Sequence, residues 1–341
     1  MKVAPLLRTL KSNKSLNFTL VHTGQHYDKK MSDVFFDDLN IPKPKYNLNV
    51  RSGSHAEQTA KIMLSFEKIC ISDSPDLLVV VGDVNSTMAC SIVAKKLNIK
   101  VAHIEAGLRS NDRDMPEEIN RLITDSITDY FFVTEDSGKE NLLKEGNKES
   151  NIFYVGNLMI DSLHYGLEKI SNKQKFSDEE YGLVTLHRPS NVDDVKKLKE
   201  ILDTLSEISN HIKLFFSLHP RTKNIIEKNN LLINKNIILL DSLSYLNFLH
   251  IMRDCKVVFT DSGGIQEETT VLKIPCYTLR HNTERPITII NGSNRLVGNN
   301  KDKILNTFLK YKFNINKNYS IPNGWDGSTS KRIINILTRI L

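Results

Sequence analysis

The sequence predicts an α/β protein with two doubly wound, Rossmann-like domains. Apolar, β-branched runs typical of buried strands recur along the chain, and helical patterns separate most of them. A chain of 341 residues is also long enough for two domains of ordinary size. Alternating strands and helices indicate parallel sheets with helices on both faces. In such sheets ligands bind beyond the carboxyl ends of the strands, so the residues that follow each apolar run are the functional candidates.

The expected strands fall into two halves of the chain. Those of the first half lie at residues 16–24, 75–83, 100–107, 129–136 and 151–157. Those of the second half lie at residues 181–189, 212–220, 236–242, 255–264 and 274–280. Between the halves we expect a helix near 159–170, followed by a polar stretch at 171–180 that is a plausible domain boundary. The polar strand ends of the two halves are expected to face each other across a cleft.

The composition excludes several classes of protein. With 40% hydrophobic and 25% charged residues and no window near the ~18 apolar residues that span a bilayer, a soluble protein without a membrane segment is expected. The four cysteines are far apart and form no C-x-x-C pair, which argues against a disulfide framework or a structural zinc site and favours the cytoplasm. The net charge of +6 is spread along the chain, so nucleic acid is not indicated. An anionic small substrate and a merely solvated basic surface fit this charge equally well.

The most informative segment is TDSGGIQEET at residues 260–269, where an apolar run turns into a helical pattern. Ser262, Gly263 and Gly264 at such a turn present unpaired backbone N–H groups at the positive end of a helix dipole, where a phosphate binds. Glu268, one turn into the helix, can accept hydrogen bonds from ribose hydroxyls. A nucleoside diphosphate is the natural ligand. A tight strand-to-helix turn without any ligand explains the glycines equally well.

Three carboxylates point to acid/base chemistry in the first half. Asp83 and Glu105 end successive expected strands, and Glu117 follows Met115-Pro116 at an expected helix start. Carboxylates that lie close together raise one another's pKa, so that one can act as an acid while another stays an ionised base. The first-turn position alone also explains an acid at Glu117.

His187 and Arg285 are the candidates for phosphate contacts in the second half. His187 follows an expected strand and can donate to a leaving phosphate or transfer a proton near neutral pH, although a simple loop histidine fits as well. Arg285 can grip phosphate oxygens with two N–H groups, and a surface salt bridge would explain it equally. No G-x-G-x-x-G or P-loop pattern follows any strand. The pair His103 and Glu105 matches only half of the zinc deaminase signature, so no metal is expected.

Taken together, the ordered motifs resemble the non-hydrolysing UDP-N-acetylglucosamine 2-epimerase family. The motifs are GQHYD (24–28), VGDVNST (81–87), HIEAGLRS (103–110), MPEEINR (115–121), VGNLMID (155–161), TLHRPSN (185–191), TDSGGIQEE (260–268) and NTERP (282–286), and the match runs to about residue 310. The resemblance implies the two-domain architecture of GT-B glycosyltransferases, divided here into residues 1–160 and 161–325, with a helix at 326–341 that returns to the first domain. It also implies a cytoplasmic homodimer without a cofactor that makes precursors of cell-surface polysaccharide.

By this resemblance the chain interconverts UDP-N-acetylglucosamine and UDP-N-acetylmannosamine. The family breaks the anomeric C–O bond to leave UDP and a 2-acetamidoglucal, and then adds UDP back. The residues that match the family's acid/base, sugar and diphosphate contacts are Asp83, Glu105, Glu117, His187, Ser262, Gly263, Gly264, Arg285 and Lys2. Glu268 matches the ribose contact, and Leu243 and Phe248 lie where the family packs the uracil. Possible allosteric residues are Gln25, His26 and His219.

The sequence departs from the family in three places. The family begins with a strand and a Gly-Thr-Arg-Pro loop ahead of the lysine that matches Lys2, and without that strand its neighbours are expected to be left unpaired. Ser190 and Ile287 stand where many members carry glutamate, and QHYD replaces the QHRE of members with an activator site. These changes keep open an epimerase of a related UDP-linked amino sugar, a diacetamido uronic acid or an N-acetylated 6-deoxy sugar. A GT-B glycosyltransferase is the other alternative.

Overall fold

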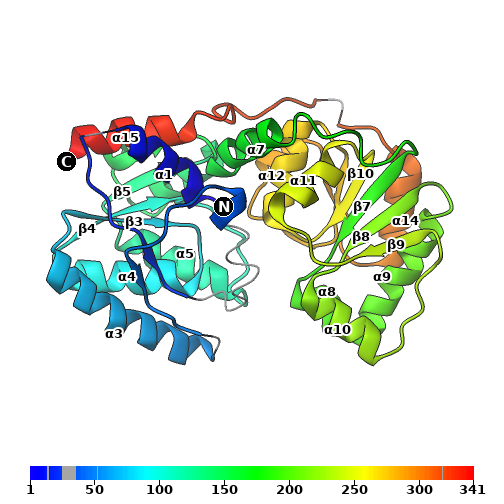
Figure 1. Cartoon of the computed structure of the whole chain (residues 1–341), viewed down its shortest axis with the longest axis horizontal. Helices are drawn as coiled ribbons and strands as arrows, with labels where there is room; N and C mark the ends of the chain where they lie inside the picture. Colours follow the sequence, from blue (N-terminus) through cyan, green and yellow to red (C-terminus); the bar gives the residue numbers. More distant parts are fainter. Residues whose placement is uncertain (14, 25–35, 52, 317) are drawn as a thin grey trace. The chain divides into compact units, whose positions relative to one another are not determined.

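The chain folds into two compact units (Figure 1). The computed structural model describes residues 1–13, 15–24, 36–51, 53–316 and 318–341. Unit 1 contains Met1–Ser162 and Asn323–Leu341, and unit 2 contains Leu163–Pro322. The division falls inside α7 (Leu158–Lys169), so the polar stretch at 171–180 is not a boundary but belongs to unit 2. A helix can continue from one unit into the next because its hydrogen bonds are local.

Unit 1 is built on a parallel sheet of four strands. Its order is β3-β4-β5-β6, which is also the order along the chain. The strands are β3 (Leu77–Val81), β4 (Lys100–Ile104), β5 (Tyr130–Val133) and β6 (Ile152–Tyr154). The helices between and before them are α3 (His55–Asp73), α4 (Asn85–Lys96), α5 (Pro116–Ser126) and α6 (Asp136–Lys144). Val81 pairs with Ile104, so the residues that follow β3 and β4 emerge side by side at one edge.

A second, two-stranded parallel sheet lies in unit 1 and consists of β1 (Val21–His22) and β2 (Tyr46–Asn47). The strand expected at 16–24 is therefore correct in place but wrong in length, and β2 was not expected. In the described part of the chain this sheet is separate from the four-stranded one, where β3 is an edge strand. Val79 in β3 is 37% exposed, which is unusual for an apolar residue of a Rossmann-like sheet.

Unit 2 is built on a parallel sheet of six strands in the order β12-β11-β10-β7-β8-β9. The strands are β7 (Tyr181–Thr185), β8 (Lys213–Ser217), β9 (Ile237–Leu240), β10 (Val257–Thr260), β11 (Cys276–Thr278) and β12 (Asn294–Leu296). The helices are α8 (Pro189–Val192), α9 (Val195–Ile208), α10 (Pro220–Lys228), α11 (Tyr245–Arg253), α12 (Gly263–Leu272), α13 (Ile287–Ile290) and α14 (Lys301–Tyr311). From β7 the order runs outward in both directions, so the switch point that binds ligands in such sheets lies between β7 and β10.

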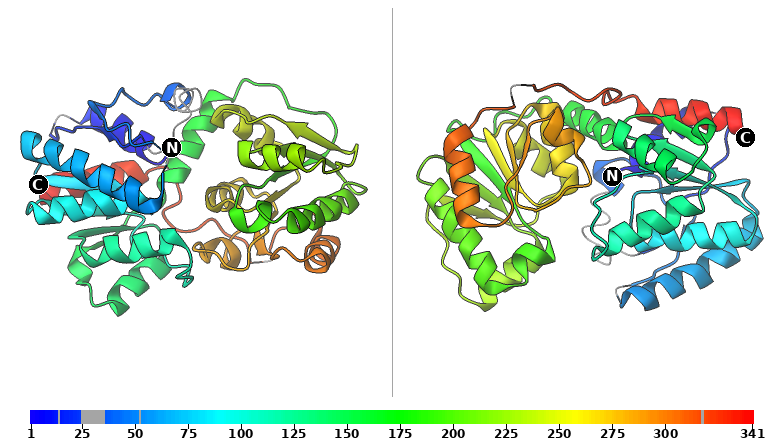
Figure 2. Two further views of the ribbon diagram at one scale, coloured as in Figure 1. Left: turned by 90° about the horizontal axis from the view of Figure 1, so that it is seen from below. Right: turned by 180° about the vertical axis from the view of Figure 1, so that it is seen from behind.

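The C-terminal helix α15 (Thr329–Ile340) packs on unit 1 beside α1 (Val3–Ser12), and Figures 1 and 2 show the two helices next to each other. Its apolar side, with Ile333 and Leu337, joins a core that includes Leu6. The carboxylate of Asp161 accepts the backbone N–H groups of Thr329 at 3.1 Å and Ser330 at 2.7 Å. This carboxylate satisfies donors that the first turn of a helix leaves unpaired.

In the described residues no helix is long and apolar enough to cross a membrane. The four cysteines are buried thiols in the structure.

Candidate active site

In unit 1, the sheet edge beyond β3 and β4 carries Asp83 and Glu105. Both strands are parallel neighbours, and each carboxylate follows the last residues of its strand. Glu105 is 3% exposed and accepts a hydrogen bond from Lys2 Nζ at 2.6 Å. The side chain of Asp83 is 24% exposed and forms a salt bridge with Arg121. Each of these acids is therefore held by a cation from a distant part of the chain.

Two side chains of helix α5 contact Asp83. Pro116 at its first turn begins the helix, because its missing N–H would be unpaired there in any case. Asn120 Nδ2 donates to the carbonyl of Asp83 at 2.9 Å, and Arg121 pairs with the carboxylate of the same residue. Glu117, one turn before Asn120, is half-buried on this helix. The structure thus brings Glu117 to the helix that holds Asp83.

The buried acid next to Glu117 was missed by sequence reasoning. Glu118 accepts N–H groups from Ser110 at 2.9 Å and Asn111 at 3.0 Å and pairs with Arg121 at 2.8 Å. Burial alone would raise the pKa of Glu118, but the Ser110 hydrogen bond and Arg121 lower it overall. The i,i+3 spacing of Glu118 and Arg121 on a helix was the available signal.

The backbone at this edge is held in left-handed conformations. Gly82 has φ 77°, Glu105 has φ 73° and Gly107 has φ 77°. An added Cβ at Gly107 would lie 2.1 Å from the carbonyl oxygen of Gly138. A left-handed residue other than glycine costs roughly 1–2 kcal/mol, and such strain persists where the surrounding contacts determine it. The orientation of Glu105 is thus imposed by the fold.

In unit 2, His187 and Asp261 meet at the switch point of the sheet. His187 follows β7, and Asp261 follows the neighbouring β10. The two side chains are 3.0 Å apart between Nδ1 and Oδ1, and the side chain of His187 is 38% exposed. Burial would raise the pKa of Asp261, but hydrogen bonds from His187, Arg188 and Asn191 lower it overall. With Nδ1–H directed to an ionised carboxylate, Nε2 is the nitrogen that remains to contact a ligand.

The helix α12 begins at the same edge of the sheet. Ser262 is its N-cap residue, with no hydrogen bond from the cap side chain to the helix, and Gly263 and Gly264 form the first turn. An added Cβ at Gly263 would lie 2.9 Å from Oε1 of Glu284. The backbone N–H groups of this first turn have no intrahelical acceptors, which is the geometry that suits an anion.

Arginines from two loops gather at this helix start. Arg285 is 4% exposed, and it forms a salt bridge with Glu267 and lies 3.7 Å from Glu284. Arg280 pairs with Glu284 at 2.8 Å. Burial would raise the pKa of Glu284, but Arg285 and Arg280 hold it well below its ordinary value. Arg285 is thus committed to carboxylates rather than to an open surface.

Two guanidinium nitrogens of this cluster, Nε of Arg188 and Nη1 of Arg280, are buried without a hydrogen-bond partner among the residues described. Buried unpaired donors of this kind are costly, and an anion satisfies them. Among the arginines, the sequence singles out only Arg285 for a phosphate contact.

The expected nucleoside contacts lie on α12 and α11. Glu268 is buried and accepts a hydrogen bond from the Tyr245 hydroxyl at 2.8 Å. Burial, followed by the charge of Glu267, raises the pKa of Glu268 to about 8. Leu243 and Phe248 are half-buried just before and within α11, the helix that carries Tyr245. Tyr245 was missed because nothing in the local sequence indicates its partner.

Of the three residues expected as possible allosteric contacts, only His219 lies in the described part of the chain. His219 is the N-cap of α10 and accepts the N–H of Arg221 at 3.2 Å, and its ring centre lies 5.8 Å from that of His187. Burial, then the charges of His187 and Arg221, lowers the pKa of His219. Gln25 and His26 lie outside the described residues.

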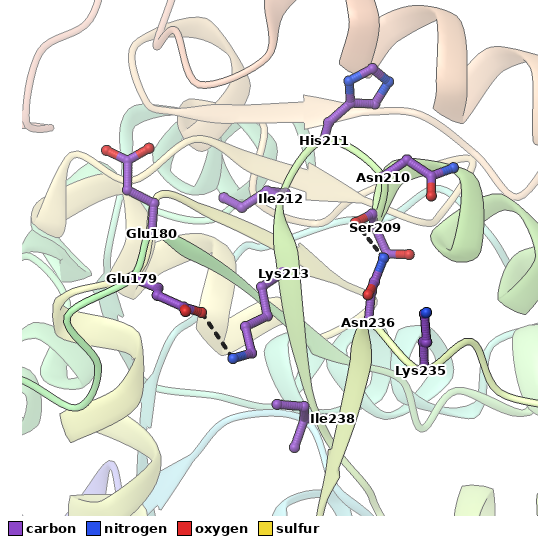
Figure 3. A pocket seen from close by; sticks show the side chains of 10 residues that line it. All are labelled: Glu179, Glu180, Ser209, Asn210, His211, Ile212, Lys213, Lys235, Asn236 and Ile238. Carbon is purple, nitrogen blue, oxygen red and sulfur yellow. Dashed lines mark hydrogen bonds and ion pairs between the residues drawn. The ribbon is translucent and has the colours of Figure 1, made fainter.

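A cavity of about 620 Å³ lies elsewhere in unit 2, and Figure 3 shows the side chains that line it. Its lining includes Glu180, Lys213 and Asn236. These residues lie at the amino ends of β7, β8 and β9, opposite the carboxyl ends where His187 and α12 are found. Ligands of doubly wound sheets bind at the carboxyl ends, so this hollow is not the candidate site. No group of three or more potential metal ligands occurs among the described residues.

The chain matches the model of one protein family, described as UDP-N-acetylglucosamine 2-epimerase, over residues 8–338. It belongs to that family. A UDP-N-acetylglucosamine 2-epimerase of Methanocaldococcus jannaschii is 44% identical over 352 residues, covering 99% of this chain and 95% of that protein. A UDP-2,3-diacetamido-2,3-dideoxy-D-glucuronate 2-epimerase of Pseudomonas aeruginosa is 37% identical over 309 residues, with 89% and 87% covered.

Solved structures of the family agree with this membership. The M. jannaschii enzyme in complex with UDP-GlcNAc and UDP has a TM-score of 0.92 at 42% identity, covering 99% of this chain and 96% of that one. The Neisseria meningitidis enzyme bound to UDP-GlcNAc has a TM-score of 0.89 at 30% identity, with the same coverage. The resemblance inferred from the motifs and the α/β class with parallel sheets are confirmed.

Proposed function

We propose that this family member interconverts UDP-N-acetylglucosamine and UDP-N-acetylmannosamine without hydrolysing either. The observation that carries the proposal is that the two sheet edges present different chemical groups. Unit 1 presents the carboxylates Asp83 and Glu105, and unit 2 presents a helix start with unpaired N–H groups and guanidinium donors. Acids suit proton transfer at the sugar, and the helix start suits the diphosphate.

The chemistry requires both functions. The C2 hydrogen of the sugar is not next to a carbonyl, so simple deprotonation and reprotonation is not accessible. Instead, a base removes the C2 proton while the anomeric C–O bond breaks, which gives UDP and a 2-acetamidoglucal. In the reverse sense a proton returns to the opposite face of C2 and a phosphate oxygen of UDP re-forms the bond to C1. No cofactor takes part, and UDP must stay bound until it adds back.

The carboxylates Asp83, Glu105 and Glu117 are the proposed proton donors, acceptors and sugar contacts, with the task of each left open. Lys2 and Arg121 keep Glu105 and Asp83 oriented when no substrate is bound. A positioned acid or base of this kind typically contributes 10²–10⁴-fold in rate.

The leaving UDP is held by unit 2 in this proposal. The first turn of α12, from Ser262 to Gly264, accepts the diphosphate, and Nε2 of His187 contacts or protonates its oxygens. Glu268 receives the ribose hydroxyls, while Leu243 and Phe248 cover the uracil. Arg285 supports this turn through Glu267 and Glu284 as well as by its charge.

One NMR experiment tests the proposal: the protein is incubated with UDP-N-acetylglucosamine in D2O. We expect deuterium at C2 in both recovered nucleotide sugars, because each passage through the glucal exchanges the proton with solvent. Accumulation of free UDP would replace the proposal with hydrolysis. Absence of exchange would favour a GT-B glycosyltransferase, which needs an acceptor, or a binding protein.

A related substrate is the second candidate, and a specific observation favours it. The P. aeruginosa relative that acts on a diacetamido uronic acid is 37% identical, and Ser190 and Ile287 depart from residues frequent in the family. The same D2O incubation with the UDP-diacetamido uronic acid, run beside UDP-N-acetylglucosamine, ranks the substrates by their initial exchange rates. A faster rate with the uronic acid would move the function to that sugar.

The proposal also covers the location of the enzyme, its oligomeric state and the use of its product. We infer a cytoplasmic homodimer whose product feeds the synthesis of cell-surface polysaccharide, an inference supported by the family membership and by four cysteines kept as buried thiols. Light scattering of the purified protein measures the oligomeric state directly.

A further inference from the structure

A buried histidine lies directly behind the acidic edge of unit 1 and has no part in the proposed chemistry. His103 is the fourth residue of β4, two positions before Glu105, and its side chain is fully buried. Its Nδ1 lies 2.7 Å from Oδ1 of Asp125, and its Nε2 lies 2.8 Å from the carbonyl oxygen of Gly82. The ring thus spans from α5 to the end of β3.

Both ring contacts require His103 to donate. A carbonyl oxygen carries no hydrogen, so Nε2 must be protonated to bind Gly82. The other oxygen of Asp125 receives the N–H of Gly107 at 3.0 Å and an N–H of Arg109 at 2.7 Å, which is the pattern of an ionised carboxylate. Nδ1 must then carry a proton as well. A neutral imidazole has one N–H and cannot make both bonds, so the ring is an imidazolium.

The charges around the ring agree with this state. Asp125 faces it from α5, Glu105 from the end of its own strand, and Arg109 from the following loop, where Arg109 is in turn paired with Glu145 at 2.7 Å. Burial alone would lower the pKa of His103, but Asp125 and the Gly82 carbonyl raise it overall. Burial would raise the pKa of Asp125, and His103 and Arg109 lower it.

The ring is linked to both left-handed turns that carry the acids, directly to one and through Asp125 to the other. The Gly82 carbonyl belongs to the peptide that leads into Asp83, and Gly82 itself is left-handed. Asp125, the second partner of the ring, holds the N–H of Gly107, two residues after the left-handed Glu105. One side chain therefore links the conformations of both turns.

We propose that His103 is a positioning residue that, as a buried imidazolium, fixes the turns bearing Asp83 and Glu105 in one relative geometry. Its catalytic consequence rests on the proposed epimerase function, whereas its charge state and its hold on the turns do not. A displacement of about 1 Å at reacting groups can cost on the order of 10²-fold in rate. His103 thus acts through Asp83 and Glu105 without touching the substrate.

The charge state is tested on the intact protein by NMR with ¹⁵N-labelled histidine, the signal of His103 being assigned by its loss in His103→Gln. We expect both ring nitrogens of His103 to be protonated from pH 6 to pH 8. We also expect the amide of Gly107 to exchange slowly with solvent, and faster in His103→Gln. A neutral ring with one unprotonated nitrogen in this range would overturn the proposal, whatever the enzyme's activity.

The positioning role is tested by steady-state kinetics of two variants. In His103→Gln we expect kcat to fall on the order of 10²-fold while KM and UDP affinity stay within about twofold, because unit 2 is untouched. In Asp125→Asn the amide can donate to Nδ1 and accept from Gly107, so both links survive with a neutral ring. We therefore expect a smaller loss of kcat and an unprotonated Nδ1.

His164→Gln is the matched control, since His164 is exposed on α7. An unchanged kcat in His103→Gln, or an equal fall of kcat and rise of KM in it, would refute the positioning role. Failure of wild-type protein to exchange deuterium would instead refute the proposed function, and the ring protonation and Gly107 exchange would still decide the structural claim.

Discussion

The two sheet edges of this protein are built in opposite ways. In unit 1 the functional groups are carboxylates on turns with left-handed backbone, each held by a cation or by a buried network. In unit 2 they are backbone N–H groups of an ordinary helix start, accompanied by arginines and an Asp–His pair. In the proposed function the difference follows from the tasks: proton transfer needs a few atoms at fixed positions, whereas an anion is held by many dipoles with more tolerance.

This comparison predicts that substitutions at the first edge affect the rate and substitutions at the second affect binding. Asp83→Asn gives the largest expected effect, a fall of C2 deuterium exchange by 10²–10⁴-fold with UDP affinity retained. Asparagine keeps the size of the side chain but accepts no proton at neutral pH. NMR exchange and UDP titration measure the two quantities, with Asp76→Asn at the exposed, amino end of β3 as the control. Unchanged exchange would remove Asp83 from the mechanism.

Glu268→Gln should change how the unfolding free energy of the protein depends on pH. The pKa of Glu268 is raised from 4.5 to about 8, so the folded protein keeps a proton that the unfolded chain releases. Its contribution to the unfolding free energy therefore falls as pH rises from about 4.5 to about 8, by on the order of 5 kcal/mol. The glutamine variant lacks this loss, because it has no proton to release.

Urea denaturation at pH 5 and pH 8.5 measures this difference. The stability of Glu268→Gln relative to wild type should increase between the two pH values. If the stability of both proteins changed equally between the two pH values, Glu268 would not be protonated at neutral pH. The inference that burial raises its pKa would then fail.

The glycines of the two edges should differ in their tolerance of a methyl group. Gly107→Ala is expected to destabilise the protein by about 2–3 kcal/mol, because its φ is positive and the new Cβ would meet the backbone of Gly138. Gly263→Ala meets only the Glu284 carboxylate and should cost about 1 kcal/mol or less. Thermal unfolding ranks the two variants. An equal loss in both would mean that strain does not distinguish the edges.

Ser262→Ala gives the smallest expected effect, a weakening of UDP binding by about 1–2 kcal/mol, the scale of a hydrogen bond to a charged group. The side chain of Ser262 makes no capping bond, so stability should be unchanged. Ser244→Ala at the start of α11 is the matched control, because its hydroxyl does accept the N–H of Asn247. It should lose stability and keep UDP affinity in calorimetry. A UDP affinity unchanged in Ser262→Ala would argue against the hydroxyl contact.

Much of this architecture could be predicted because its signals are local. The runs at 75–83 and 255–264 are apolar and β-branched, and they contain β3 and β10. The short strands β2 and β12 were missed because two or three residues carry no period. The position of Asp83, Glu105, His187 and Ser262 just after strands could be predicted, because the carboxyl edge of a parallel sheet is fixed by strand direction.

The sequence by itself determined the family, the α/β class and which residues stand at the strand ends, since apolar periodicity and turn chemistry are properties of contiguous residues. Only the tertiary structure decided the partners: Lys2 with Glu105, Asp125 with His103, Tyr245 with Glu268. These pairs join residues separated by 103, 22 and 23 positions. Burial and the nearest charge set the protonation of each group, and both depend on segments that meet only after the chain has folded.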